Sequence, residues 1–427
     1  MQQIRLIFAT ATIVAFLSTT CLFGQEKLGS AINGSFVRID SNQQHGYTMD
    51  TEALGKAISG TRIFALGEAT HGTRNFVDFR LSMIKKLVLE LGYRAIITES
   101  DFSSTIAMND YILNGQGDVR KCLQGMGYWM WNNPDFLRTI EWLRVYNSSA
   151  AGENKVQIFG CDMTVPGVIE QILREQQTLK QPLTERSMSG LKILGVWSGR
   201  SISKEEKTSL TELSAALNSQ LPLYKDTSFF KQSLKTILQV VSFRLMGPGK
   251  NQSAIRDKAM FDNINWIYNI GRQGKVIFLA HNLHISKKSI LSGWENVGSL
   301  LHKAYGSKYY SLGLVFSKGA FRAQDRVSGK SKVFSVDSNR RSLEFALHNS
   351  TMPNFYLDFS FAKNIDVPGE FFNKAQPMRA VGALFSNSKS DDAASLVVAV
   401  PSEAFDGIAF FKETFATDPS FGWKKYE

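Results

Sequence analysis

Residues 63–76 read Ile-Phe-Ala-Leu-Gly-Glu-Ala-Thr-His-Gly-Thr-Arg-Asn-Phe, and they indicate the fold class more clearly than any other part of the chain. The first four residues are all apolar, which is typical of a buried strand. Gly67 ends the strand, and Glu68 and His71 follow in a tight connection that contains a second glycine. The apolar periodicity of residues 76–91 then predicts a helix. Open α/β proteins place functional residues at the carboxyl ends of strands, so this connection is the first candidate site.

Similar apolar runs recur along the chain, and helical patterns alternate with them. The runs are residues 94–98, 155–160, 275–280, 309–316, 354–358 and 407–411. Nearly continuous apolar strands that alternate with helices indicate a parallel sheet covered on both faces. We therefore expect the α/β class, with a mostly parallel sheet in a three-layer α/β/α arrangement. Residues 166–250 show helical spacing and few strand signals, and we interpret them as a helical insertion.

The N-terminus has the features of an export signal. Arg5 precedes a mostly apolar run, residues 6–23, within a chain of 427 residues. This order is typical of a secretory signal peptide, so we predict that residues 1–24 are removed and that an α/β domain at residues 35–427 is periplasmic or secreted. The alternatives are that the run is retained as a membrane anchor or that Cys21 is lipidated in the envelope. After cleavage, no remaining run is long and apolar enough to cross a membrane.

The distribution of charge argues against a nucleic-acid partner. The formal net charge of +11 is spread along the chain, without a Lys/Arg run that alternates with aromatic residues. We therefore predict a solvated basic surface and no nucleic-acid partner.

Cys122 and Cys161 would remain in the mature chain and could pair in an oxidising compartment. We interpret both as small buried apolar side chains, because two cysteines alone carry no geometric signal.

Acidic and histidine side chains follow four of the expected strands, where each strand ends. They are Glu68 and His71 after the first strand, Glu99 after the second, Asp162 after the third, and His281 and His284 after the fourth. Since the carboxyl ends of parallel strands meet at one edge of a sheet, we expect these side chains to converge. Histidine suits proton transfer near neutral pH, and a nearby carboxylate can fix its tautomer.

Three residues near these positions have both a functional and a structural interpretation. Arg80 shares a helix face with apolar residues, so it either binds a carboxylate such as Glu68 or Glu99 or extends its head to water. Asp162 could instead cap the helix expected after it. Trp131 either belongs to the core or lines an apolar pocket, and the core is the simpler interpretation.

Taken together, these motifs resemble those of the erythromycin esterase family. The resemblance runs from about residue 60 to the C-terminus, and the motifs occur in the family's order. They are Gly67-Glu68-Ala69-Thr70-His71-Gly72-Thr73, Arg80, Glu99, Asn109-Asp110-Tyr111, Trp129-Met130-Trp131, Phe159-Gly160-Cys161-Asp162-Met163, Arg256-Asp257-Lys258-Ala259-Met260, Ala280-His281-Asn282-Leu283-His284, Gly319-Ala320-Phe321-Arg322-Ala323 and Phe405-Asp406-Gly407-Ile408-Ala409-Phe410. The chain departs from the family at Asn75, where many members carry glutamate, and at Cys161, where an aromatic residue is common.

The resemblance implies a hydrolase that opens an ester with an activated water and needs neither a metal nor another cofactor. In characterised members the ester is the macrolactone ring of macrolides such as erythromycin. The family's general base corresponds to His71, and its other catalytic positions correspond to Glu68, Glu99, Arg80, His281 and His284. The resemblance also suggests substrate binding by Asp162, Trp131 and Arg256. The expected partner is a small-molecule ester.

The residue types favour the same chemistry. No Gly-x-Ser-x-Gly sequence is present, so a serine nucleophile of the α/β-hydrolase kind is not predicted. We hypothesise that His71, oriented by Glu68 or Glu99, removes a proton from a water that attacks the ester carbonyl. Arg80 and one histidine of the second pair would then stabilise the oxyanion or protonate the leaving alcohol.

Other functions compete with this hypothesis. A divalent metal could bind His71, His281 and His284 together with Glu68 or Glu99, since zinc sites of two histidines and one glutamate are well known. The chain would then be a metal-dependent hydrolase, or an iron- or haem-associated envelope protein of similar fold. A non-enzymatic binding protein fits the sequence less well, because binding alone would not require a histidine–glutamate pair beside an arginine.

Overall fold

The computed structural model describes residues 36–42, 46–50, 52–163, 179–195, 201–247, 252–270, 274–362 and 370–422. The expected signal peptide lies outside these residues, as do parts of the expected insertion at 164–178, 196–200 and 248–251. The chain divides into two compact units. The first consists of Met1–Ser59, Glu68–Phe76 and Ser311–Ala416, and the second consists of Gly60–Gly67, Val77–Tyr310 and Thr417–Glu427.

The second unit is built on parallel strands in the order β3-β6-β4-β5. They are β3 (Ile63–Leu66), β6 (Val276–Leu279), β4 (Ala95–Asp101) and β5 (Gln157–Asp162). All residues of β3 and β6 are buried, as the uninterrupted apolar runs predict. β4 continues beyond the expected residues 94–98, because its pairing with β5 resumes at Asp101 after an irregularity. Glu99 therefore lies inside a strand and not after it.

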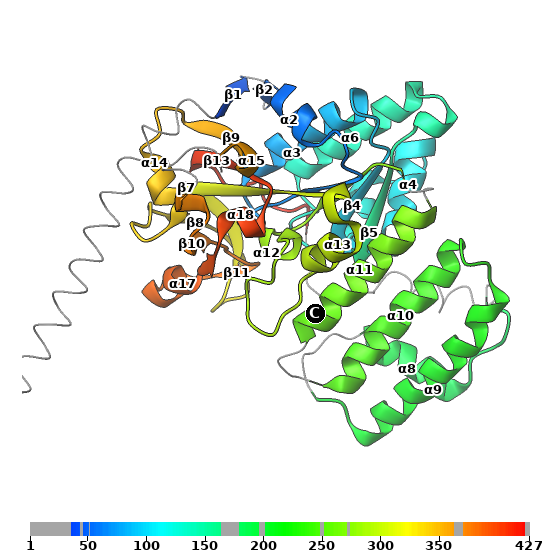
Figure 1. Cartoon of the computed structure of the whole chain (residues 1–427). Coiled ribbons are helices and arrows are strands. Elements are labelled where there is room, and N and C mark those ends of the chain that lie inside the picture. The colour runs from blue at the N-terminus through cyan, green and yellow to red at the C-terminus, as the bar shows by residue number, and fades with distance from the viewer. Residues whose placement is uncertain are drawn as a thin grey trace, which may run out of the picture. The chain divides into compact units, whose positions relative to one another are not determined.

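Helices cover both faces of this sheet (Figure 1). α3 (Arg74–Leu89), α4 (Thr105–Asn114) and α6 (Pro134–Ser149) lie on one face, and α11 (Gln252–Ile270) and α13 (Val297–Tyr305) lie on the other. Right-handed crossovers explain this division. The path from β3 through β4 to β5 crosses the sheet in one direction, and the return from β5 to β6 crosses in the opposite direction. The expected α/β class with a three-layer arrangement is therefore found in this unit.

Between β5 and α11, the described residues include no strand and contain three long helices. They are α8 (Glu185–Gly195), α9 (Lys204–Gln220) and α10 (Phe229–Met246). α9 begins with a capping box in which Ser203 and Glu206 exchange hydrogen bonds. Apolar side chains of the three helices, such as Leu191, Leu213 and Leu234, belong to one buried cluster. The described part of the expected insertion is therefore helical.

The first unit has a sheet in the order β2-β1-β9-β13-β7, and β8 and β11 also pair with β7. The strands are β1 (Val37–Asn42), β2 (Gly46–Met49), β7 (Tyr309–Asp325, from Ser311 on), β8 (Ser331–Val336), β9 (Asn354–Asp358), β11 (Leu384–Phe385) and β13 (Gly407–Thr414). β10 (Gln376–Arg379) and β12 (Leu396–Ala399) form a separate pair. β13 is parallel to β7 and antiparallel to β9, so this unit is mixed.

Shorter helices complete both units. They are α2 (Glu52–Ala57), α14 (Leu343–His348), α15 (Phe359–Ala362), α17 (Lys389–Ala394) and α18 (Pro401–Ala404) in the first unit, and α5 (Val119–Gly125) and α12 (Asn282–Ile285) in the second. Cys122 and Cys161 are both buried and unpaired, as expected for small apolar side chains. Among the described residues, no helix combines the length and the apolar character needed to cross a membrane.

Candidate active site

The first group of candidate residues is Glu68 and His71, in the first unit. Oε1 of Glu68 lies 2.9 Å from Nδ1 of His71, and only 3% and 8% of their respective side chains are exposed. A carboxylate can only accept a hydrogen bond, so Nδ1 carries the hydrogen and Nε2 keeps its lone pair while the ring is neutral. A histidine that removes a proton through Nε2 requires this tautomer.

Backbone hydrogen bonds within the first unit hold the connection that carries this pair. The N–H of Val381 donates to the carbonyl of Ala69 at 2.7 Å, and the N–H of Arg322 donates to the carbonyl of Gly72 at 2.8 Å. The second contact requires glycine, because a Cβ on Gly72 would lie 2.1 Å from the carbonyl oxygen of Arg322. The Glu68–His71 pair is thus attached to a fixed backbone, as a positioned base requires.

The second group lies in the second unit and consists of Glu99, Asp162, Arg256, Asp257 and His284, which we call the acid–histidine cluster. Oε1 of Glu99 accepts from Nη2 of Arg256 at 2.9 Å and lies 3.2 Å from Nε2 of His284. Oε2 accepts the backbone N–H of His281 at 2.9 Å. Each oxygen of this buried carboxylate therefore has a donor, as the cost of burying a charge demands.

Asp162 is fully buried and is held mainly by Arg256. Its Oδ2 accepts from Nε and Nη2 of Arg256 at 3.0 Å and 2.5 Å, and also from the hydroxyl of Tyr128 at 2.9 Å. Its Oδ1 accepts the backbone N–H of Met163 at 2.7 Å. The helix that Asp162 was expected to cap lies outside the described residues. The substrate-binding roles of Asp162 and Arg256 stay predictions, because these contacts join the two side chains to each other.

His284 is bound by carboxylates on both sides of its ring. Nδ1 lies 2.9 Å from Oδ2 of Asp257, and Nε2 lies 3.2 Å from Oε1 of Glu99. Burial favours the neutral ring, but the charges of Asp257 and Glu99 outweigh burial and raise the pKa of His284 to about 10. Nη1 of Arg256 also lies 3.1 Å from Nε2, so this nitrogen faces a donor as well as a carboxylate.

The sequence interpretation missed Asp257, although the pattern of α11 contains a signal. Asp257, Met260, Ile264 and Ile267 recur at helical spacing, and all four are buried. A carboxylate in an otherwise apolar stripe must have a cation or several donors as partners. This position could have been added to the candidates for that reason.

His281 is the residue that precedes α12, and its ring has a defined tautomer. The backbone N–H of Leu283 donates to Nδ1 of His281 at 3.2 Å, so Nδ1 is an acceptor and Nε2 carries the hydrogen. The turn packs closely on the end of β3, because a Cβ on Gly67 would lie 2.0 Å from Oδ1 of Asn282. This explains why glycine follows β3 at residue 67.

Arg80 and Trp131 are buried, with 4% and 3% of each residue exposed. Nη2 of Arg80 donates to the carbonyls of Leu66 and Ala280 at 3.0 Å and 2.8 Å, and so ties the carboxyl ends of β3 and β6 together. Nε1 of Trp131 donates to the carbonyl of Glu99 at 2.9 Å. These contacts favour the core interpretation of Trp131, whereas its substrate contact and the Arg80–carboxylate contact stay predictions.

In the part of the chain that the structure describes, no group of three or more His, Cys, Asp and Glu side chains is arranged to hold a metal ion. The metal-site hypothesis stays a prediction.

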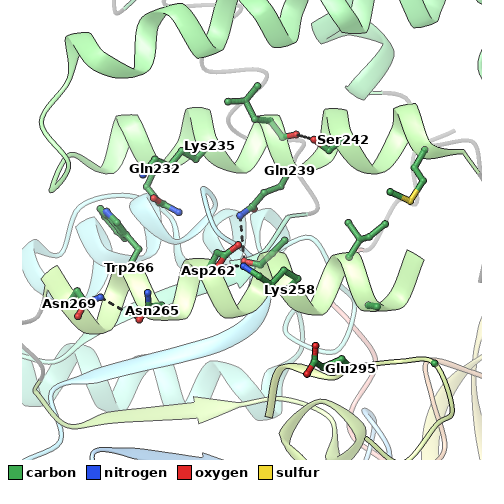
Figure 2. Close-up of a pocket in the computed structure, with 16 residues that line it drawn as sticks. Gln232, Lys235, Gln239, Ser242, Lys258, Asp262, Asn265, Trp266, Asn269 and Glu295 are labelled. Atoms are coloured by element: carbon green, nitrogen blue, oxygen red, sulfur yellow. Dashed lines mark hydrogen bonds and ion pairs between the residues drawn. The ribbon is translucent and has the colours of Figure 1, made fainter. Parts of the chain in front are cut away.

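A groove of about 1000 Å³ lies between α10 and α11 (Figure 2). Its lining includes Gln239 and Ser242 from α10, and Lys258, Asp262 and Trp266 from α11. No residue of the acid–histidine cluster lines it. One face of α11 therefore contributes to the acid–histidine cluster, and a different face lines the groove. Substitutions on the groove face can serve as controls for substitutions in the cluster.

Comparison with known proteins identifies relatives over most of the chain. The family model described as erythromycin esterase matches residues 88–414. Erythromycin esterase type II of Escherichia coli is 25% identical over 398 residues, which covers 80% of this chain and 92% of the relative.

Two solved structures share the fold. A succinoglycan biosynthesis protein has a TM-score of 0.76 at 19% identity, covering 92% of this chain and 98% of its own. An erythromycin esterase mutant in its open conformation has a TM-score of 0.59 at 18% identity, covering 87% and 96% respectively. At these identities, the likeness concerns the fold alone.

The match to the family model includes Glu99 and the rest of the acid–histidine cluster, but it begins after Glu68, His71 and Arg80. It nevertheless extends over more than half of the chain. The chain therefore belongs to the erythromycin esterase family and is a hydrolase.

Proposed function

We propose that this chain is an exported carboxylic ester hydrolase in which His71 activates a water molecule for attack on the ester carbonyl. The observation that carries the proposal is the 2.9 Å contact between Oε1 of Glu68 and Nδ1 of His71, in a buried environment. The carboxylate orients the ring and stabilises the imidazolium that forms once Nε2 has taken a proton from water. Of the two acids that the sequence allowed as partners of His71, we assign this role to Glu68, because Glu99 is occupied within the acid–histidine cluster.

The two histidines of the second pair receive different roles in this proposal. His281 carries a hydrogen on Nε2, so it can donate to the oxyanion or to the leaving alcohol. His284 contacts Asp257 through Nδ1, and Arg256 and Glu99 through Nε2, so both of its ring nitrogens are occupied and we assign it no proton transfer. Arg80, bound to carbonyls at the ends of β3 and β6, contributes positive charge at the carboxyl edge of the parallel strands.

The proposed substrate is a small-molecule ester, and a macrolactone such as erythromycin is the first candidate. The family and the name of the Escherichia coli relative support this choice. The expected signal peptide at residues 1–24 supports export. Hydrolysis in the periplasm would inactivate an antibiotic before it reaches the cytoplasm, which would make the chain a resistance enzyme.

Mass spectrometry of erythromycin incubated with the mature protein tests this function. We expect a product heavier by one water, and we expect His71→Ala to lower the rate by about 10²–10⁴. His302→Ala, at an exposed histidine of α13, is the matched control and should leave the rate unchanged. A parallel sample treated with a chelator tests the metal-dependent alternative.

Each outcome of this experiment has a defined meaning. Near-full activity of His71→Ala would contradict the mechanism, and activity lost to chelator but restored by a divalent metal would favour the alternative. If erythromycin remains unchanged, the macrolide assignment is wrong, and a panel of other carboxylic esters tests the broader assignment.

A further inference from the structure

The groove between α10 and α11 follows both helices along most of their length (Figure 2). Its lining positions recur at helical spacing, from Gln232 to Met246 on α10 and from Ala254 to Asn269 on α11. Each stripe covers about four turns, which makes the groove about 20 Å long. Its volume of about 1000 Å³ is at the upper end of the range for small-molecule sites. The groove can therefore hold an elongated ligand.

The charges that line the groove balance one another. They are those of two lysines and two acids, Lys235 and Lys258 with Asp262 and Glu295. Lys258 pairs with Asp262 at 2.5 Å, and Glu295 pairs with Lys303, so three of the four charges already have an opposite charge beside them. A lining without net charge does not attract a polyanion or a polycation. A neutral ligand therefore fits this groove best.

Amide and hydroxyl side chains lie along the whole groove, and Gln239 is at its middle. Nε2 of Gln239 lies 3.5 Å from the carbonyl oxygen of Ala259 and 3.4 Å from Oδ1 of Asn263, which is long for an N–H···O hydrogen bond. An apolar ligand, or the apolar face of a partner helix, would bury this amide without a good partner, at a cost in free energy. A ligand with hydroxyl groups can both donate to an amide and accept from it. The other uncharged polar side chains of the lining are Gln232, Ser242, Asn265 and Asn269.

Trp266 supplies a fixed aromatic surface in the same groove. Its Nε1 donates to the carbonyl of Asp226 at 2.8 Å, and its ring packs against Phe229 with a centroid distance of 5.1 Å and the planes at 81°. The indole is half-buried and extends from α11 toward α10 (Figure 2), and Leu238 and Ile255 add apolar surface. A sugar ring has C–H groups on its faces and hydroxyl groups around its edge. Such a ring can pack against the indole while its hydroxyl groups reach the amides.

We propose that the groove between α10 and α11 is a binding site for a neutral oligosaccharide. Gln239 and the neighbouring amides bind the hydroxyl groups of the sugar, and Trp266 packs against one of its rings. The site is distinct from the acid–histidine cluster, because no residue of that cluster lines the groove. It adds a carbohydrate-binding function to the chain, and it does not rest on the proposed ester hydrolysis.

Isothermal titration calorimetry of the mature protein with tetrasaccharides is the first test. The neutral probes are maltotetraose, cellotetraose and chitotetraose, and a tetramer of galacturonic acid tests the effect of charge. We expect saturable binding of at least one neutral probe and weaker binding of the acidic one. No saturable binding of any neutral probe, or tighter binding of the acidic tetramer, would overturn the proposal. The titration contains no ester, so its result is separate from that of the proposed function.

Gln239→Leu tests whether the sugar binds in the groove. Leucine has a similar size but forms no hydrogen bond, so we expect the affinity for the sugar to fall by about 3- to 10-fold. An apolar partner helix would bind this variant as tightly as the wild type or more tightly, which distinguishes the two kinds of ligand. Trp266→Phe reduces the aromatic surface, and we expect it to weaken binding by about 2- to 10-fold.

Gln124→Leu is the matched control, because Gln124 is an exposed glutamine of α5 that does not line the groove. We expect it to leave the affinity for the sugar unchanged. Urea unfolding of the three variants checks that each is folded. Unchanged binding in both groove variants, or an equal loss of affinity in Gln124→Leu, would contradict the placement of the site in the groove.

Discussion

His71 and His284 are both buried and both contact glutamate, yet their ring nitrogens have different neighbours. Nδ1 of His71 contacts the carboxylate of Glu68, which lies three residues before it in the chain. Nδ1 of His284 contacts the carboxylate of Asp257, which lies on a different helix, and Nε2 lies close to both Glu99 and Nη1 of Arg256. The partner of His71 is therefore local in the sequence, whereas the partners of His284 come from elements far apart in the chain. The comparison shows that residue type does not assign a role to a histidine, because the neighbours of each ring nitrogen decide what it can do.

The largest effect is expected from the carboxylate of the Glu68–His71 pair. Glu68→Gln keeps the size of the side chain but removes the charge and allows the amide to donate to Nδ1. We expect kcat/KM to fall by about 10²–10⁴, because the wrong tautomer of His71 becomes available. Steady-state kinetics measures the loss, and urea unfolding checks that the fold is intact. A change in kcat/KM of less than about threefold would contradict the role of Glu68 in fixing the tautomer of His71.

A large loss of stability is expected in the acid–histidine cluster. Arg256→Met leaves Glu99 and Asp162 buried without their guanidinium. Breaking a buried ion pair on one side costs about 3–5 kcal/mol, and because 24% of the Arg256 side chain is exposed, we expect the lower end of that range. Urea unfolding measures the free energy. The control Arg186→Met removes an exposed pair with Glu212 and should cost about 0.2–1 kcal/mol. Equal losses in both variants would be inconsistent with a special role for the cluster.

A smaller effect is expected in the pH dependence of stability. The pKa of His284 is raised from 6.5 to about 10 in the folded chain, so the folded state holds a proton that the unfolded state has lost. This stabilisation is fully present below about pH 6.5 and is lost as the pH rises through 10, with a limiting slope of about 1.4 kcal/mol per pH unit. Urea unfolding at several pH values between 7 and 10 measures the slope. The slope should be weaker in His284→Gln, and an identical slope in that variant would count against the assignment.

The strands of the second unit could be predicted because each contains an apolar run, which is uninterrupted in β3 and β6. β3 matches the expected residues 63–66, and β6 lies within the expected residues 275–280. The β1–β2 hairpin and β8 were not predicted, because their residues are mostly exposed or half-buried and form no continuous apolar run. Such strands form through pairing with a neighbour, as β8 does along β7, and their own sequence gives little signal.

Which acid contacts His71 could not be predicted from the sequence. Glu68 and Glu99 both follow apolar runs, so residue type and position along the chain do not distinguish them. The distinction depends on where β4 ends and on which donors meet its last residues. Asp257 lies on a helix and follows no expected strand, so its buried position in the apolar stripe of α11 marks it as a candidate, but only the packing of α11 shows that His284 is its partner.

By itself, the sequence determined the α/β class, the helical character of the described part of the middle segment and the residue types available for ester hydrolysis. These follow from periodicity and from side-chain chemistry, which are local properties. Only the tertiary structure decided that Glu68 is the partner of His71, that Nε2 of His281 carries its hydrogen, and that His284 is bound between two carboxylates. Protonation and hydrogen bonding depend on distance and burial, and these are fixed only when residues far apart in the chain pack together.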